Sequence, residues 1–433
     1  MVRWFSIVCA WSVAVVCLAQ SPKEEFRKNL CFSAGSFLAY PGPQQQKLTP
    51  APSGKRPFYI SHYGRHGSRH HTRQEDYDYP LNALRRAENA GCLTALGRDV
   101  LARLEAIKQN SNGHLGELTE LGQQQHRDIM MRMFERFPDV FKGDATVDAR
   151  STLTVRCVMS MSSALLQLLS LNPKLNIRQQ ASQSDLYYLS NIERDFSQEA
   201  VSKENRTLFG DYCQKHQSWQ RLIPLLFNDT AYINSHVNGE RLNYYLFRLA
   251  SILQDTDLRN KITLYDLFTD EEVYENWAKE NAYWFLGYGF CPSNGGRQPF
   301  SQRHLLRNII ETADSCLRLP RPGATLRFGH DTILLPLVCL LGINNYDKTV
   351  TDPEQLERHG WVDYRVIPMA GNIQFVFYRK NPADNDVVFK VLLNESEATL
   401  PLKTDMPPYY RWSDFRDYYL QRINSYEKEH RAK

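Results

Sequence analysis

A short strand-prone run, Phe58–Ser61, is followed by several helix-prone segments before another strand signal appears. Apolar residues recur at helical spacing over residues 96–107 and 129–137, and Pro138 ends the second pattern. Residues 158–171 form a third apolar helix pattern. One early strand followed by helices is typical of a chain in which helices cover a sheet.

The middle of the chain, residues 175–300, is rich in Tyr, Trp, Asn and charge, and its clearest patterns are helical. Strand signals then return in three segments: Ala324–Phe328, Asn372–Tyr378 and Val387–Leu393. We therefore predict an α/β fold with a mixed central sheet flanked by helices, formed by residues 20–174 and 301–433. Residues 175–300 are predicted to form a mostly helical inserted domain, and residues 20–56 an irregular lead-in.

Residues 1–19 are typical of an export signal. Arg3 gives a positive start, Trp4–Leu18 is apolar, and small residues precede Gln20. The apolar run is short for a membrane span, although a retained anchor is the alternative. We expect this segment to be removed and the protein to be exported, to a periplasm, an outer surface or the extracellular space, with no membrane association afterwards.

The net charge bears on nucleic-acid binding, and the cysteine content bears on disulfide formation. The chain has 52 Lys and Arg against 48 Asp and Glu, and loss of Arg3 with the signal leaves a net charge of +3. This balance is too small to indicate nucleic-acid binding. Seven cysteines remain after cleavage, so an exported chain predicts roughly one to three disulfides without indicating which residues pair. No feature indicates the oligomeric state.

The segment Arg65-His66-Gly67-Ser68-Arg69 carries the strongest chemical signal. Two arginines supply forked, permanently charged donors that match phosphate oxygens. The histidine supplies a ring nitrogen that can attack phosphorus and leave again. The glycine allows the backbone to approach a ligand closely. Because ligands of α/β sheets bind beyond the carboxyl ends of strands, the pattern predicts a site for a phosphate ester.

Two other interpretations of this segment remain open at this point. It could be a solvated basic loop with one structural histidine. It could also bind a metal, since His62, His66, His70 and His71 recur at near-helical spacing. Flanking glycines disfavour a helix there, and paired arginines repel a cation, so we expect neither a metal nor a cofactor. The roles of His62, His70 and His71 are not assigned.

Two distant segments support the phosphate interpretation. His330 and Asp331 follow the strand signal at 324–328 and open an apolar helix, whose free N–H groups favour an anion. Asp331 could cap that helix, or it could protonate a leaving alkoxide. Arg156 opens another helix; taken alone it would be an ordinary surface residue.

Together these residues resemble the histidine acid phosphatases, the second branch of the histidine phosphatase superfamily. The family motifs Arg-His-Gly-x-Arg and His-Asp are matched by Arg65, His66, Gly67 and Arg69, and by His330 and Asp331. Arg156 lies in a context similar to that of multiple inositol polyphosphate phosphatases. The likeness covers about residues 55–402, and the helical insert matches poorly.

The resemblance implies a two-step mechanism without a metal. His66 would be the nucleophile and Asp331 the proton donor, while four residues would hold the phosphate oxygens: Arg65, Arg69, Arg156 and His330. The implied substrate is an inositol polyphosphate such as phytate, and Lys55 and Arg73 are candidate contacts for further phosphates.

Two features depart from the inositol polyphosphate subgroup. That subgroup usually carries His-Ala-Glu where this chain has His330-Asp331, and residues 70–73 replace a proline-containing turn. A broad acid or sugar phosphatase is therefore the alternative. A non-catalytic anion-binding protein is a more remote one.

Overall fold

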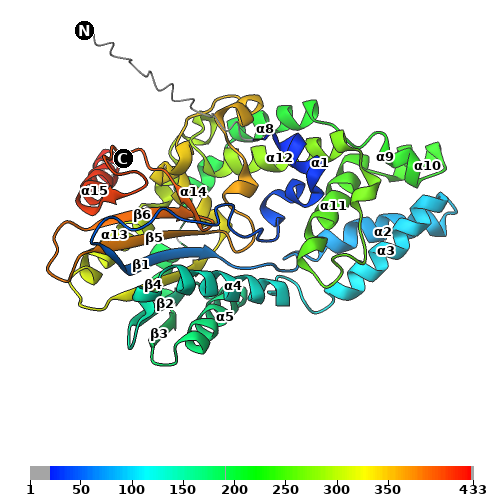
Figure 1. Cartoon of the computed structure of the whole chain (residues 1–433). Coiled ribbons are helices and arrows are strands. Elements are labelled where there is room, and N and C mark those ends of the chain that lie inside the picture. The colour runs from blue at the N-terminus through cyan, green and yellow to red at the C-terminus, as the bar shows by residue number, and fades with distance from the viewer. Residues whose placement is uncertain (1–19, 191, 431–433) are drawn as a thin grey trace, which may run out of the picture.

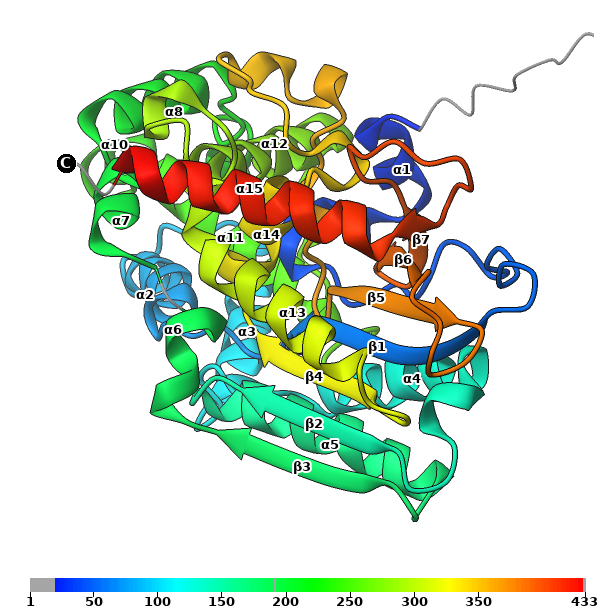
Figure 2. The same cartoon turned by 90° about the vertical axis from the view of Figure 1, so that its left-hand side faces the viewer.

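In the computed structural model, which describes residues 20–190 and 192–430, eight strands form one mixed sheet (Figures 1 and 2). The strands are β1 (Arg56–Arg65), β2 (Thr146–Ser151), β3 (Asn176–Ala181), β4 (Gly323–Gly329), β5 (Asn372–Arg379), β6 (Val388–Leu393), β7 (Ser396–Ala398) and β8 (Tyr410–Arg411). Their order is β3-β2-β4-β1-β5-β6-β7, with β8 also paired to β6. The predicted mixed sheet flanked by helices is confirmed.

The parallel part of the sheet brings three chain segments to one edge. β1, β2, β3 and β4 run parallel, with Arg65 opposite Gly329 and Ser151 opposite Phe328. The residues that follow β1, β2 and β4 therefore leave the sheet side by side, which is where α/β folds place ligands. Strands β5 to β8 continue the sheet in antiparallel pairing.

Helices cover both faces of this sheet (Figure 2). On one face lie α4 (Glu120–Arg136) and α5 (Val155–Leu171), and on the other α13 (Arg303–Cys316), α14 (Asp331–Leu341) and α15 (Trp412–His430). Successive β1 residues point to opposite faces. Accordingly Ile60 packs in the core beneath α4 and α5, and Tyr59 in the core beneath the other three helices.

The middle of the chain is mostly helical, as predicted. It contains α6 (Leu186–Leu189), α7 (Arg194–Ala200), α8 (Lys203–Lys215), α9 (Leu222–Leu226), α10 (Thr230–His236), α11 (Gly239–Ile252) and α12 (Asp270–Tyr288). The spatial boundaries differ from the sequence boundaries in two places. β3 pairs with β2, so the sheet extends beyond residue 174. α2 (Glu75–Asn89) and α3 (Ala95–Ser111) share a hydrophobic core with α9, α11 and α12.

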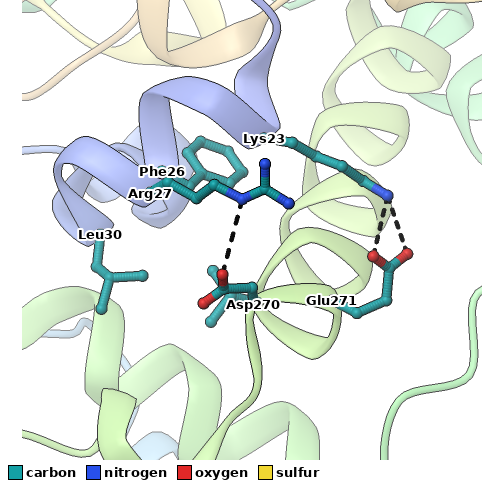
Figure 3. A pocket seen from close by; sticks show the side chains of 7 residues that line it. Lys23, Phe26, Arg27, Leu30, Asp270 and Glu271 are labelled. Atoms are coloured by element: carbon teal, nitrogen blue, oxygen red, sulfur yellow. Dashed lines mark hydrogen bonds and ion pairs between the residues drawn. The ribbon is translucent and has the colours of Figure 1, made fainter.

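The lead-in is more ordered than the sequence indicated. It forms α1 (Pro22–Lys28) and the 3-10 segment η1 (Leu30–Phe37). Figure 3 shows α1 against the start of α12, where Lys23 pairs with Glu271 at 3.0 Å and Arg27 with Asp270 at 3.8 Å. The Phe26 ring also meets Trp277 edge-on at 5.1 Å. Burial of aromatic side chains against the insert thus orders a segment that has weak local signals.

The disulfide prediction is wrong for the described part of the chain, where all seven cysteines are free thiols. Cys92 lies in the helical core, whereas Cys291 and Cys339 lie in the core around α14. Among the described residues no helix is long and apolar enough to cross a membrane. The predicted export signal, residues 1–19, lies outside the described residues.

Candidate active site

The three segments predicted to form a site meet at the carboxyl edge of the parallel strands. His66 directly follows β1, Arg156 lies in the first turn of α5 after β2, and His330 joins β4 to α14. The backbone N–H of His66 donates to Gly329 O at 2.9 Å, and the rings of His66 and His330 are 5.8 Å apart. Arg65 Nη2 lies 2.6 Å from Asp331 Oδ2. Residues more than 260 positions apart in the sequence are thus direct neighbours.

Close backbone packing fixes the loop that carries His66. A Cβ atom on Gly67 would lie 2.4 Å from Gly122 O, and one on Gly122 would lie 2.3 Å from Ser68 O. Gly67 N–H also donates to Ser160 Oγ at 3.2 Å. The sequence predicts that Gly67 lets a ligand approach the backbone, whereas in the structure the close approach is to the first turn of α4.

The His66 ring is held with one nitrogen free to react. Its Nδ1 lies 2.9 Å from Gly67 O. Because a carbonyl oxygen only accepts, Nδ1 carries the proton and Nε2 keeps its lone pair. Burial, together with the charges of Arg65 and Arg69, lowers the pKa of His66 well below its usual value. The residue is therefore a neutral potential nucleophile.

Arg65 is the most firmly held of the three cations. Its side chain is fully buried, and Nη1 donates to Ser36 O at 2.5 Å and to Ile367 O at 2.6 Å. These carbonyls come from η1 and from the segment before β5, so the ordered lead-in takes part in building the site.

The other two arginines are held more loosely. The Arg69 guanidinium lies over the Phe37 ring at 5.7 Å and donates to His70 O at 2.9 Å. Burial and the charge of Arg65 lower the pKa of Arg69 to about 10, so it stays charged in neutral solution. Arg156 is half-buried, and its charge, like those of Arg65 and Arg69, lowers the pKa of His66.

Asp331 is the first residue of α14, and the N-cap position belongs to His330. The capping interpretation of Asp331 is therefore wrong. Its Oδ1 accepts a hydrogen bond from Thr332 N at 2.8 Å, while Oδ2 pairs with Arg65. Burial would raise the pKa of Asp331, but the charges of Arg65 and Arg69 outweigh it and the net pKa is lowered. Burial lowers the pKa of His330 to about 4, so this ring is neutral.

One predicted contact is excluded by the structure and another stays open. Lys55 precedes β1, at the end of the sheet away from His66, and its buried ammonium pairs with Asp384 at 3.0 Å. The proposed role of Lys55 in substrate binding is therefore wrong. Arg73 is half-exposed beyond the loop that carries Arg69, and its partner is Asp76 at 3.3 Å.

The other histidines in and beside this segment pack against different partners. His62 packs near Phe328 and His126, His70 stacks on His114 at 5.5 Å, and His71 packs edge-on against Phe37. Within residues 20–190 and 192–430, no group of three His, Cys, Asp or Glu side chains has the arrangement of a metal site. The near-helical spacing noted in the sequence thus does not bring these rings together.

The helical insert contributes residues near the site that the sequence does not predict. Arg248 of α11 donates to Asp76 Oδ1 at 3.0 Å and lies over Phe37 at 5.0 Å, on the same ring as Arg69. In α12, burial and the carboxylates of Glu280 and Asp331 raise the pKa of Tyr283, so this side chain lies within electrostatic range of Asp331. These residues have no local sequence signal, because only the packing of the insert brings them to the site.

The arrangement is suited to breaking a phosphate monoester. A neutral ring nitrogen lies among three guanidinium groups that can hold phosphate oxygens, and a carboxyl group stands beside it for proton transfer. Fold and site together are those of the histidine phosphatases, as the comparison with known proteins also shows.

Residues 64–394 match the histidine phosphatase superfamily (branch 2), and the chain belongs to this family. Human multiple inositol polyphosphate phosphatase 1 is 24% identical over 349 residues, or 72% of this chain and 67% of that protein. The multiple inositol polyphosphate phosphatase of Bifidobacterium longum, solved with inositol hexasulfate, has a TM-score of 0.73 at 18% identity, covering 89% of this chain and 96% of that one. The phytase from D. castellii has a TM-score of 0.69 at 15% identity, covering 95% and 89%. At these identities the solved structures establish the shared fold.

Proposed function

We propose that this chain is an exported phosphatase that hydrolyses phosphomonoesters of inositol polyphosphates, phytate included, through a covalent phosphohistidine on His66. The observation that carries the proposal is the hydrogen bond from His66 Nδ1 to Gly67 O, which leaves a neutral Nε2 among three arginines. An anion-binding protein needs the arginines but has no use for an oriented nucleophile beside a carboxyl group.

The reaction proceeds in two steps. His66 Nε2 attacks phosphorus and forms the N–P bond while the bond from phosphorus to the leaving oxygen breaks. Asp331 gives its proton to that oxygen, and the alcohol departs. Water then attacks the phosphohistidine, the Asp331 carboxylate takes up a proton from this water, and breaking of the N–P bond restores His66 and releases phosphate.

Substrate binding itself prepares Asp331 for this role. In the free protein, Arg65 stabilises the Asp331 carboxylate, which is the wrong form for an acid. A phosphate dianion bound between the arginines neutralises part of their positive charge and adds negative charge near Asp331. Both changes raise the pKa of Asp331, so it becomes protonated when there is a leaving group to accept the proton.

The relatives support the choice of substrate. The human relative is named for inositol polyphosphates, one solved relative holds inositol hexasulfate, and another is a phytase. On this chain, Arg73 is the candidate contact for a second phosphate, since its guanidinium is half-exposed and shares Asp76 with Arg248 of α11. The His330-Asp331 pair keeps a broad acid or sugar phosphatase as the alternative substrate assignment.

Trapping of the intermediate tests the mechanism, and a substrate panel tests the specificity. Labelled substrate quenched during turnover should give an acid-labile, base-stable phosphoenzyme that His66→Ala lacks. His70→Ala is the matched control, since His70 lies in the same loop but stacks on His114. Equal kcat/KM on phytate and glycerol phosphate would favour the broad phosphatase, and absence of hydrolysis of any ester would overturn the proposal.

Export is proposed on the sequence of residues 1–19 alone. Secretion of the full chain by a suitable host, with a mature N-terminus at or near Gln20, is the expected result. A protein that stays inside the cell with an intact N-terminus would contradict it. We propose no cofactor, no nucleic-acid partner and no membrane association after cleavage.

A further inference from the structure

A buried carboxyl group from the helical insert lies directly behind the catalytic loop. Asp255 ends the 3-10 segment η4 (Leu253–Asp255), which continues α11, and its side chain has no exposed surface. Its Oδ1 lies 2.5 Å from Ser68 Oγ. Ser68 occupies the variable position of the motif, between the nucleophile's glycine and Arg69.

The direction of each hydrogen bond around Ser68 follows from its donors. Gln125 Nε2 of α4 donates to Ser68 Oγ at 2.7 Å, and Ser68 N–H donates to Gln125 Oε1 at 2.9 Å. Because the Gln125 amide nitrogen can only donate, the single hydroxyl proton of Ser68 goes to Asp255 Oδ1. Thr119 N–H additionally donates to Ser68 O at 2.9 Å. Ser68 is therefore held from the sheet domain and from the insert at the same time.

This anchoring matters because no ion pair fixes the Arg69 guanidinium among the described residues; besides the Phe37 ring it has only one hydrogen-bond partner. Its Nη1 bonds only to the neighbouring carbonyl of His70, and its Nε is buried without a hydrogen-bond partner in the described part of the chain. The direction of the guanidinium thus depends on the backbone at residues 68–70 more than on an ion pair. A shift of Ser68 would also move Gly67, whose carbonyl orients the His66 ring.

We infer that Asp255 is a positioning residue: through Ser68 it holds His66 and Arg69 in the geometry that accepts a phosphate group. The inference rests on the proposed function of those two residues. It assigns the helical insert a part in holding the catalytic loop.

The protonation state of Asp255 suits this role. Burial raises its pKa to about 8, although the hydrogen bond from Ser68 and the charges of Arg65 and Arg69 act in the opposite direction. In acidic solution the carboxyl group is therefore mostly neutral. It accepts the Ser68 hydrogen bond without cancelling the positive charge that binds phosphate. The other titratable groups that its charge reaches are Cys31 and Tyr265.

Two substitutions of Asp255 separate hydrogen bonding from burial. Asp255→Asn keeps an acceptor for Ser68, whereas Asp255→Leu has a similar volume and no acceptor. We expect Asp255→Leu and Ser68→Ala each to lower kcat/KM and to weaken competitive inhibition by inorganic phosphate about tenfold or more, the effect of losing a buried hydrogen bond. Asp255→Asn should retain most of both.

A double-mutant cycle and a matched control decide whether the effect passes through Ser68. The double variant Ser68→Ala/Asp255→Leu should be no worse than the worse single variant, since both break the same link. Glu272 is the control, because it is another buried carboxylate of the insert but pairs with Arg221 away from the loop. Glu272→Leu should lower Tm and leave phosphate inhibition unchanged.

Several outcomes would overturn the inference. They are unchanged phosphate inhibition in Ser68→Ala, an effect of the double variant equal to the product of the single effects, and a loss in Asp255→Asn as large as in Asp255→Leu. If Asp255→Leu does not fold, Ser68→Ala and Asp255→Asn still provide the test. Failure of the proposed function would be seen separately, as wild-type protein that neither hydrolyses esters nor forms a phosphoenzyme.

Discussion

The guanidinium of Arg65 and the carboxylate of Asp331 form an ion pair at 2.6 Å, with Arg65 fully buried and the Asp331 side chain 14% exposed. The group that should hold the transferred phosphate is therefore already paired with the group that should protonate the leaving oxygen. Substrate and proton donor compete for the same cation, which couples binding of phosphate to protonation of Asp331.

The first prediction concerns the leaving group. Asp331→Asn removes the proton donor, so hydrolysis of phytate, whose inositol oxygen departs poorly without a proton, should fall about 10²- to 10⁴-fold. Hydrolysis of p-nitrophenyl phosphate should fall much less, because nitrophenolate departs without help. The measurement is kcat on both substrates. Equal losses on the two esters, or no loss on either, would show that Asp331 is not the acid.

The second prediction concerns pH. His66 has a strongly lowered pKa and stays neutral in acid, whereas Asp331 must gain a proton, so activity should be higher in acidic than in neutral solution. The charge of Arg69 lowers the pKa of Asp331. In Arg69→Gln, the residual activity should therefore persist to higher pH than in the wild type. Profiles of kcat against pH test this, and a basic limb that stays in place or moves to lower pH would contradict it.

Local chemistry explains which parts of the site could be predicted. Arg65, His66 and Arg69 are adjacent in the chain, and a strand followed by a glycine turn already places them at a sheet edge. Asp255 and Ser68 are 187 residues apart, and their contact depends on how the insert packs. The charge of Lys55 suggests a place in the site. In the structure its ammonium pairs with Asp384 instead, and nothing near Lys55 in the sequence indicates this distant partner.

The third prediction concerns stability in acid. His126 is buried, its two ring nitrogens have no hydrogen-bond partner among the described residues, and burial lowers its pKa to about 3. The unfolded chain binds this proton near pH 6.5, so between these values the unfolded state holds more protons and stability falls as pH falls. His126→Phe should lessen this decline by up to about 1.4 kcal/mol per pH unit.

Denaturant unfolding at several pH values measures this decline. His359→Gln is the control, because this histidine is exposed. If His126→Phe loses stability with falling pH as steeply as the wild type, His126 does not contribute to the acid sensitivity.

The fourth prediction concerns metal ions. Arg65, Arg69 and Arg156 supply the positive charge that a phosphate dianion requires, and their repulsion disfavours a cation at the same place. Hydrolysis of phytate should therefore survive exhaustive dialysis against a chelator. Loss of activity that returns when zinc or magnesium is added would mean that a metal takes part.

The last prediction concerns Arg156, which is half-buried, and Arg73, which is half-exposed. We expect each to contact a different phosphate of the substrate. Arg156 acts on His66 and should hold the phosphate that reacts, so Arg156→Ala should lower kcat/KM about 10²-fold on phytate and on glycerol phosphate alike. Arg73 is half-exposed and lies toward α11, so Arg73→Ala should lower kcat/KM only about three- to tenfold, and on phytate alone.

Arg85→Ala, which removes an exposed arginine paired with Glu105, is the control and should leave kcat/KM on both substrates unchanged. Added salt should weaken phytate binding more in the wild type than in Arg73→Ala, because exposed charge contacts are screened. Equal effects of Arg73→Ala on the two substrates would mean that Arg73 serves only as a partner of Asp76.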